Sequence, residues 1–170
     1  MDPVDDEIRE EHPGDVAAIR EVIRLAFGQD QEATLVDALR ANGAAQLSVV
    51  AVRGDRVVGH IMYSPVTVGT VTGAGLAPMA VRPDHQRQGI GTRLVEAGNL
   101  TLSARRCPVI VVLGHPRFYR RFGFRPARHD GLRCEWDVPD DVFMSLVLDP
   151  AAMRGISGLA KYRPEFATVA

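Results

Sequence analysis

The N-terminal quarter of the chain carries apolar residues at helical spacing. A helix is predicted to begin after Asp15, whose side-chain oxygen can accept bonds from the first free N–H groups, and to end near Phe27. Its inward face consists of apolar side chains, namely Val16, Ile19, Val22, Ile23 and Phe27. A second helix is predicted at residues 32–41, ending before Gly43. Each helix therefore presents one apolar face to a core.

The next part of the chain has the composition of β-strands. Residues 47–53 and 56–63 are apolar and β-branched, and the Gly54-Asp55 pair between them predicts a hairpin. A bend is then predicted by a cluster of residues that interrupt regular structure, namely Pro65, Gly69, Gly73 and Gly75. A further strand is predicted after this bend, at about residues 75–81.

The second half of the chain alternates helices and strands. A helix is predicted at residues 89–104, a buried strand at 109–113, a short helix at 114–123 and a last strand at 142–148. Two strands that pair in parallel need a crossover connection, and the first of these helices can supply it. The pattern therefore predicts an α/β domain with a mixed sheet.

Composition narrows the class of protein. The 170 residues are 46% hydrophobic, with a formal net charge of -1 and a pI near 6.5. We expect one domain across residues 1–170, with an ordered core at about 8–166 and a flexible segment at 1–7. A near-neutral chain argues against a nucleic-acid partner, which requires a basic surface. The absence of a long apolar run and of a signal peptide predicts a cytoplasmic protein with no membrane contact.

A short loop joins the strand at 75–81 to the helix that follows it. The loop and first helical turn have the sequence Gln86-Arg87-Gln88-Gly89-Ile90-Gly91-Thr92. The first N–H groups of a helix lack intrahelical acceptors and lie at the positive end of its dipole, so they can bind a diphosphate. Glycine at 89 and 91 would let phosphates approach the backbone closely, although both residues could also serve only to shape a tight turn.

Two other phosphate-binding motifs fit this segment less well. A dinucleotide-binding fold requires the spacing Gly-x-Gly-x-x-Gly, and the third of these positions is Leu94. A P-loop ends in Lys-Ser/Thr, whereas Gly91 is followed by Thr92-Arg93. Neither motif is therefore favoured.

Two elements of the sequence resemble the GNAT superfamily of N-acetyltransferases. Gln86-x-x-Gly89-x-Gly91 is similar to the family's cofactor motif, Arg/Gln-x-x-Gly-x-Gly/Ala, and it follows an apolar strand as in the family. The segment from Tyr119 to Phe124 resembles the family's Tyr-x-x-x-Gly-Phe element. Further pieces resemble the YhbS-like group over about residues 19–166, namely Glu32–Val36, Val58–Ile61, Gly114–Pro116 and Gly158–Tyr162.

The resemblance implies a fold and a reaction. In such enzymes a mainly antiparallel mixed sheet is flanked by helices, and two central strands splay apart to admit acetyl-CoA. Here the backbone of Met79, Ala80 and Val81 would pair with the pantetheine arm, and an N–H near Met79 or Ala80 would polarise the thioester oxygen. The pyrophosphate would be held by Gln86, Arg87, Gln88, Gly89, Ile90, Gly91 and Thr92. The acceptor amine would attack directly in a ternary complex, with no metal involved.

The resemblance also assigns a general acid to Tyr119, which would protonate the departing CoA thiolate. A phenol has a reference pKa of about 10 and is therefore protonated at neutral pH. Periodicity alone favours a different role for Tyr119, that of an aromatic packing residue between Phe118 and Phe122.

The general base is open among three candidates. Glu32 lies where the family's substrate-facing helices lie, but a solvated or capping carboxylate would look the same. His60 is on a central strand and could equally be a hydrogen-bonded core histidine. His115 follows a buried strand directly, and it could also serve only to shape the turn before Pro116.

Other function classes remain compatible with the sequence. One is a non-catalytic acyl-CoA sensor, which would need the cofactor loop but no acid. Another is an interaction module on the same fold, and a third is an enzyme using a different acyl-CoA or an alcohol acceptor. Cys107 and Cys134 provide neither a disulfide framework nor a metal cluster, so no metal is expected. The expected partners are acetyl-CoA and an unidentified amine, bound to a monomer or homodimer.

Overall fold

The computed structural model describes residues 6–169 of the chain. Residues 1–5, most of the segment that we predicted to be flexible, lie outside this range. The prediction needs correction at its last two positions. Glu7 begins strand β1 (Glu7–Glu10), and the Asp6 carboxylate accepts a 2.6 Å hydrogen bond from Nε of Arg53. Strand pairing and this ion pair hold Asp6 and Glu7 against the sheet.

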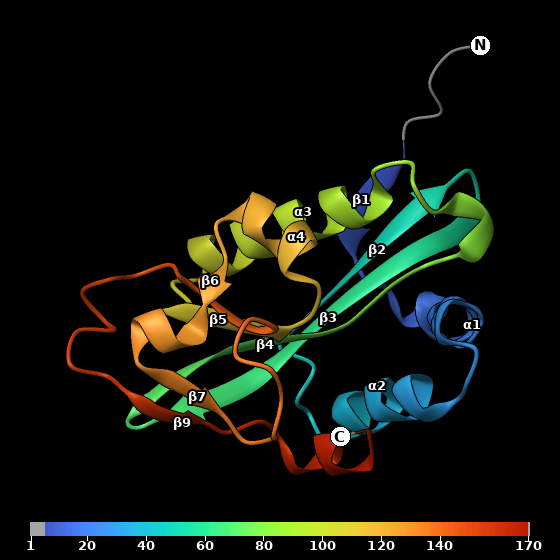
Figure 1. The fold of residues 1–170 in the computed structure, drawn as a ribbon. Coiled ribbons are helices and arrows are strands. Elements are labelled where there is room, and N and C mark those ends of the chain that lie inside the picture. The colour runs from blue at the N-terminus through green and yellow to red at the C-terminus, as the bar shows by residue number, and fades with distance from the viewer. Residues whose placement is uncertain (1–5, 170) are drawn as a thin grey trace.

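A seven-stranded sheet forms the centre of the molecule, in the order β1-β2-β3-β4-β5-β8-β6 (Figure 1). Its strands after β1 are β2 (Leu47–Arg53), β3 (Arg56–Val68), β4 (Val71–Val81), β5 (Val109–Leu113), β6 (Arg125–Pro126) and β8 (Phe143–Val147). All neighbours pair antiparallel except β4 and β5, which run parallel. The prediction of a mixed, mainly antiparallel sheet is thus confirmed.

Helices cover both faces of this sheet (Figure 1). On one side lie α1 (Val16–Phe27) and α2 (Gln31–Ala41), and on the other lie α3 (Ile90–Ala104) and α4 (Pro116–Tyr119). Each layer has its own buried apolar cluster, because side chains of a strand alternate between the two faces. A separate parallel pair consists of β7 (Leu132–Cys134), which lies between β6 and β8 in sequence, and β9 (Gly158–Ala160), which follows β8.

The remaining regular segments are short 3-10 helices. They comprise Pro13–Asp15, Pro83–His85, Arg120–Phe122, Ala127–Asp130 and Pro164–Thr168. The third of them completes the short helix that we predicted at 114–123.

The hairpin of β3 and β4 is longer than the sequence suggested, because three of the four predicted bend residues lie within strands. Only Gly69 occupies the turn, with φ of 56°. The N–H of Thr67 points away from β4 and donates to the carbonyl of Lys161. Because a strand repeats every two residues, the nitrogen of Pro65 also faces away from β4. Proline at this position therefore removes no hydrogen bond between β3 and β4. A Cβ on Gly73 would lie 2.5 Å from the Val109 carbonyl oxygen. Glycine there permits close strand packing rather than a bend.

Close packing between α3 and the sheet depends on Gly98. An ideal Cβ at this position would lie 2.3 Å from Oη of Tyr63, a fully buried residue whose hydroxyl donates to Asn99. We predict that Gly98→Ala lowers the free energy of unfolding by about 1–3 kcal/mol, because a methyl group there overpacks the core. Urea denaturation measures the change. Gly14→Ala is the control, since its Cβ meets nothing within 4 Å. Equal stability of the two variants would contradict the packing argument.

Candidate active site

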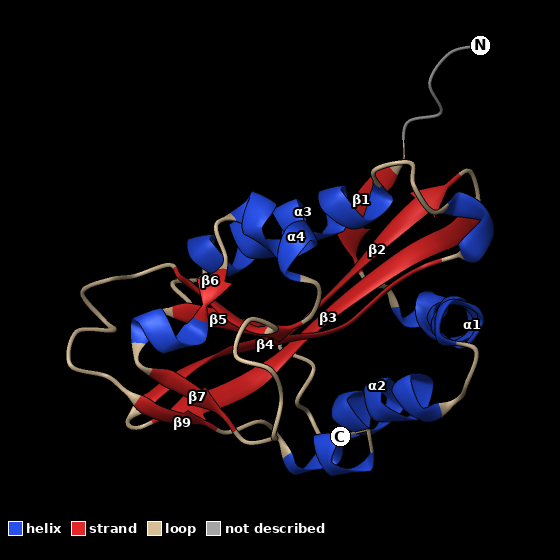
Figure 2. Cartoon of the chain, in the orientation of Figure 1, coloured by secondary structure: helices blue, strands red, loops and turns tan. Residues whose placement is uncertain are grey.

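A gap opens in the middle of the sheet, where the neighbouring strands β4 and β5 (Figure 2) cease to pair. The two strands pair only where Ala74, Gly75 and Leu76 face residues 110–112. Beyond Leu76, β4 continues to Val81 along β3, whereas β5 ends at Leu113. The edge of β4 that faces away from β3 is therefore left without a strand partner over its last residues.

A β-bulge marks the start of the gap. Ile61 pairs with Met79 and Tyr63 pairs with Leu76, so two residues of β4, Ala77 and Pro78, stand opposite one residue of β3. Such a bulge bends the strand and increases its twist locally, which turns the end of β4 away from the straight course of β5.

The direction of the backbone N–H groups beyond the bulge follows from one hydrogen bond. The N–H of Arg82 donates to the Val58 carbonyl of β3 at 2.8 Å. Because a strand repeats every two residues, the N–H of Ala80 points to β3 as well, and those of Met79 and Val81 point into the gap. The Val81 carbonyl accordingly accepts a bond from Nε2 of Gln86 on the open side. Of the two N–H groups considered for the thioester oxygen, that of Met79 has the required direction.

The loop after β4 ends in the first turn of α3 and has two residues in the left-handed region. These are Arg87, with φ of 62°, and Gly89, with φ of 81°. The first helical hydrogen bond runs from the N–H of Arg93 to the carbonyl of Gly89. The N–H groups of Ile90, Gly91 and Thr92 precede that bond and are available to an anion at the positive end of the helix.

A cavity of about 360 Å³, here called the loop cavity, lies at this helix start. It is lined by Met79, Val81, His85, Gln86, Arg87, Gly89, Ile90, Gly91, Thr92, Phe118 and Arg121. An ideal Cβ on Gly91 would lie 3.5 Å from Sδ of Met79, an ordinary contact, so the fold itself does not require glycine there. A ligand that approaches the backbone would require it, and in this respect the loop fits a diphosphate.

Two of the predicted loop residues have other partners. Oε1 of Gln88 accepts a 2.7 Å bond from Arg53, and Gln88 is not among the described residues that line the loop cavity. The Thr92 hydroxyl accepts a 3.0 Å bond from Arg121, whose guanidinium lies 4.9 Å from the ring centroid of Phe118. Arg121 therefore places a cation at this cavity, outside the segment of the cofactor motif.

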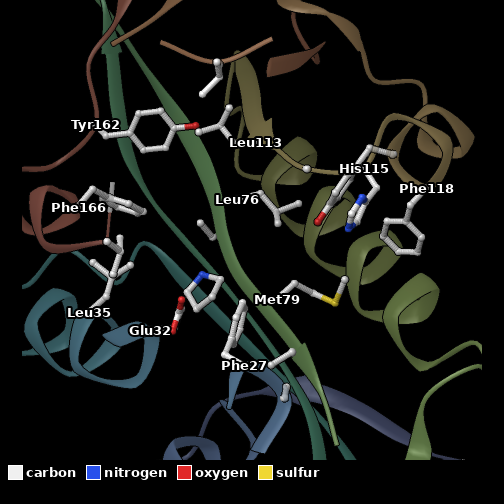
Figure 3. A pocket seen from close by; sticks show the side chains of 18 of the residues that line it. Phe27, Glu32, Leu35, Leu76, Met79, Leu113, His115, Phe118, Tyr162 and Phe166 are labelled. Atoms are coloured by element: carbon white, nitrogen blue, oxygen red, sulfur yellow. The ribbon is translucent and has the colours of Figure 1, made fainter. Parts of the chain in front are cut away.

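A larger cavity of about 910 Å³, here called the main cavity, contains the gap between β4 and β5 (Figure 3). Its walls come from widely separated segments: Ala26, Phe27, Glu32, Leu35, Leu76, Ala77, Pro78, Met79, Ala80, Val81, Gln86, Leu113, Gly114, His115, Phe118, Tyr119, Trp136, Asp137, Val138, Tyr162, Phe166 and Val169. Met79, Val81, Gln86 and Phe118 line both cavities, so the two form neighbouring parts of one site.

Tyr119, our candidate acid, lies in the wall of the main cavity at the end of α4, with 7% of its surface exposed. Its ring packs edge-on against Phe118 and Phe124, with centroid distances of 4.9 and 5.6 Å. A Cβ on Gly114 would lie 2.4 Å from this ring, so glycine there makes room for the tyrosine. Burial raises the pKa of the Tyr119 phenol to about 12, which keeps it protonated at neutral pH.

Two of the three base candidates reach the same cavity. In Figure 3, Glu32 lies beside Phe27 and Leu35 on the α1–α2 side, whereas His115 lies on the opposite side near Phe118. The amide of Gln29 donates to both Glu32 carboxylate oxygens, at 2.8 and 3.1 Å. The cavity therefore brings together a phenol, a carboxylate and an imidazole.

His60 lies elsewhere, with none of its surface exposed and outside the described lining of the main cavity. Its Nε2 is 2.9 Å from Oγ of Ser48, and that hydroxyl donates to Glu11. Burial lowers the pKa of His60 to about 3, so the ring is neutral at physiological pH. This is the core histidine that we considered as the alternative, and it has no access to an acceptor.

The cavity wall also contains residues that we had not proposed for the site. Rings of Trp136 and Tyr162 have centroids 4.9 Å apart, and those of Tyr162 and Phe166 are 5.0 Å apart. Asp137 adds a second carboxylate. Among these residues, only Tyr162 belonged to a segment with a recognised resemblance, and nothing in that segment indicated that it would face β4.

Residues 6–169 contain neither a cluster of metal-binding side chains nor a helix that could span a membrane. Within that range, no group of three or more His, Cys, Asp or Glu side chains could hold a metal ion. The helices described there are all too short or too polar to cross a bilayer.

Known proteins resemble this chain in architecture and in sequence. The acetyltransferase (GNAT) domain family matches residues 44–126. An uncharacterized N-acetyltransferase of Escherichia coli K12, YhbS, is 36% identical over 162 residues, which cover 94% of this chain and 97% of that protein. Its crystal structure in complex with CoA matches with a TM-score of 0.93 over 98% of this chain and 95% of the other.

A second solved structure extends the likeness to another organism. It is a GNAT acetyltransferase from Brucella melitensis in complex with acetyl-CoA, 34% identical, with a TM-score of 0.80 over 96% of this chain and 99% of the other. With such identity over nearly the whole length, the chain belongs to the GNAT family of acetyl-CoA-dependent N-acetyltransferases. The family resemblance that its cofactor motif indicated is thereby confirmed.

Proposed function

We propose that this protein transfers the acetyl group of acetyl-CoA to a primary amine while both are bound, with the residues of the two cavities in the roles that follow. One observation carries the proposal. The N–H groups of Met79 and Val81 point into a gap whose opposite wall contains a buried phenol, that of Tyr119. Hydrogen-bond donors and an acid thus face the same space, as acyl transfer requires.

The donor half of the site binds the nucleotide end and the arm of acetyl-CoA. The N–H groups of Ile90, Gly91 and Thr92 would donate hydrogen bonds to the pyrophosphate, and Arg121 would add positive charge at the same cavity. The exposed edge of β4 at Met79 and Val81 would pair with the pantetheine amides. Bound there, acetyl-CoA supplies an acetyl group activated as a thioester.

The catalytic roles rest on protonation state and position. The N–H of Met79 would donate to the acyl oxygen as negative charge develops on it. Tyr119 would give its proton to the departing sulfur, since its raised pKa keeps that proton in place beforehand. The second proton, which the nitrogen loses on becoming an amide, would restore the Tyr119 phenol through water. Glu32 would hold the acceptor ammonium and take up its proton, directly or through water, and His115 is the second candidate for this step.

We place this reaction in the cytoplasm, where unpaired thiols such as those of Cys107 and Cys134 stay reduced. The acceptor is expected to be a small molecule or a protein amine. A monomer or homodimer is expected as the working form.

Thiol release tests the enzymatic role against a non-catalytic acyl-CoA sensor. With acetyl-CoA and a panel of primary amines, we predict CoA release that depends on the amine, together with N-acetylated product in mass spectra. A sensor would bind acetyl-CoA but release no thiol with any amine. The buried phenol in the cavity favours the enzyme, because a sensor has no use for a positioned acid.

A further inference from the structure

One side of the main cavity, here called the acceptor side, is formed by Phe27, Glu32, Trp136, Asp137, Tyr162 and Phe166. Its side chains differ in kind from those of the cofactor loop. The family match at residues 44–126 contains both the loop and Tyr119. Phe27 and Glu32 precede that range, and Trp136, Asp137, Tyr162 and Phe166 follow it. The groups that would contact an acceptor therefore belong largely to segments outside the common core of the family.

Aromatic side chains give this side an apolar wall. Tyr162 stands between Trp136 and Phe166, with ring centroids 4.9 and 5.0 Å away. In Figure 3 the Tyr162 ring extends across the cavity, with its hydroxyl toward Leu113. The Tyr162 ring packs closely against β4 at Gly75, where an ideal Cβ would lie 2.9 Å from the ring. Such a wall suits a planar apolar group.

The polar groups on the acceptor side favour a cation with little other polarity. Among the described residues lining the main cavity, the Asp, Glu, Lys and Arg members are Glu32 and Asp137, both acidic. Acidic side chains that have no basic neighbour among these lining residues attract a positively charged group.

We propose that the acceptor is a small primary aralkylamine, whose ammonium binds beside the carboxylate of Glu32 and whose ring packs against Trp136 and Tyr162. The exposed Asp137 adds negative charge to the same cavity. This assignment rests on the proposed acetyl transfer, and it narrows the acceptor of that same site. Highly polar amines, such as polyamines and aminoglycosides, fit the wall poorly because their hydroxyl and amino groups would lose water against apolar rings.

Fluorescence of Trp136, the single tryptophan of the chain, reports binding at this wall directly. With CoA present, we predict a saturable change on titration with phenethylamine. Two matched ligands separate the contributions, since 2-phenylethanol lacks the ammonium and ethylamine lacks the ring. Each is expected to bind at least about tenfold more weakly than phenethylamine.

Substitutions at Glu32 and Tyr162 test whether these residues bind phenethylamine. Glu32→Gln and Tyr162→Leu are expected to weaken phenethylamine binding about tenfold or more. Tyr162→Phe, which keeps the ring, should stay within about threefold of the wild type. Glu96→Gln is the control, because it removes the same charge from the exposed surface of α3.

Several results would overturn the proposal. They are the absence of a saturable change with phenethylamine, tighter binding of spermidine or kanamycin than of phenethylamine, and equal binding by Glu32→Gln and the wild type. A parallel titration with acetyl-CoA distinguishes failure of the acceptor assignment from failure of the proposed acetyl transfer. If acetyl-CoA binds and phenethylamine does not, the acceptor class is wrong and acetyl transfer stands. If acetyl-CoA does not bind, the proposed function fails, and the acceptor assignment fails with it.

Discussion

Tyr119→Phe is expected to lower kcat about ten- to a thousandfold while the affinity for acetyl-CoA barely changes. The substitution removes the hydroxyl and keeps the ring, so the contacts with Phe118, Phe124 and Gly114 persist. Only the proton for the departing thiolate is lost. Steady-state rates at saturating acetyl-CoA and amine measure the effect, and unchanged turnover would remove Tyr119 from the mechanism.

Tyr63→Phe provides a matched control for this experiment. It also removes a buried phenol hydroxyl, but Tyr63 lies outside the described lining of the main cavity and donates to Asn99. Its loss should lower the free energy of unfolding by about 1 kcal/mol and leave kcat near that of the wild type. A comparable fall in kcat for both variants would mean that the Tyr119 effect is structural.

The pH dependence distinguishes the acid role further. A phenol can donate its proton only below its pKa, and burial raises the pKa of Tyr119 to about 12. Titration of Tyr119 should therefore cause no fall in kcat between about pH 8 and about pH 10. A decline in that window that disappears in Tyr119→Phe would contradict the raised pKa.

Gly91→Glu is expected to weaken acetyl-CoA binding at least about a hundredfold, or by about 3 kcal/mol. The side chain would bring volume and negative charge to the N–H groups that would hold the pyrophosphate. The position tolerates a Cβ, whose nearest contacts are 3.5 Å from Met79 and 3.6 Å from Phe118, so the fold should survive. Gly89 is a poorer choice for this test, because its φ of 81° would strain any other residue.

Gly14→Glu adds the same charge far from the loop cavity, where a Cβ meets no atom within 4 Å. It should bind acetyl-CoA like the wild type. Thermal unfolding of both variants shows whether the fold is intact. Equal affinities for the Gly91 and Gly14 variants would contradict the position assigned to the pyrophosphate.

Local patterns predicted the loop after β4 and the start of α3 well, because these parts are contiguous in the chain. Residues 86–92 contain the loop and the start of the helix together, and Gly89 and Gly91 stand at the spacing of the family's cofactor motif. The helix predicted at 89–104 is present as Ile90–Ala104 for the same reason, since its packed face repeats at helical spacing.

Elements defined by partners far away in the chain were harder to predict. Strand β1 has the sequence Glu-Ile-Arg-Glu, which lacks an apolar pattern, and it exists because it pairs with β2. Gly73 and Gly75 indicate bends in isolation, but in the sheet they accommodate Val109 and Tyr162. In both cases tertiary contacts outweigh local preference.

The acceptor half shows the same limit. Its wall combines α1 and α2 with Trp136 and with residues after β9, and no spacing along the chain reveals that these side chains meet. His60 illustrates the converse, since a histidine on a central strand can face either layer. The fold directs it toward Ser48 and away from the cavity.

Isothermal titration of the wild-type protein with acetyl-CoA tests the central claim most directly, with Gly91→Glu measured alongside. We predict saturable binding of one acetyl-CoA per chain to the wild type and its loss in the variant. If neither protein binds acetyl-CoA, the two cavities do not form a cofactor site. The chain would then be an interaction module that retains the acetyltransferase fold.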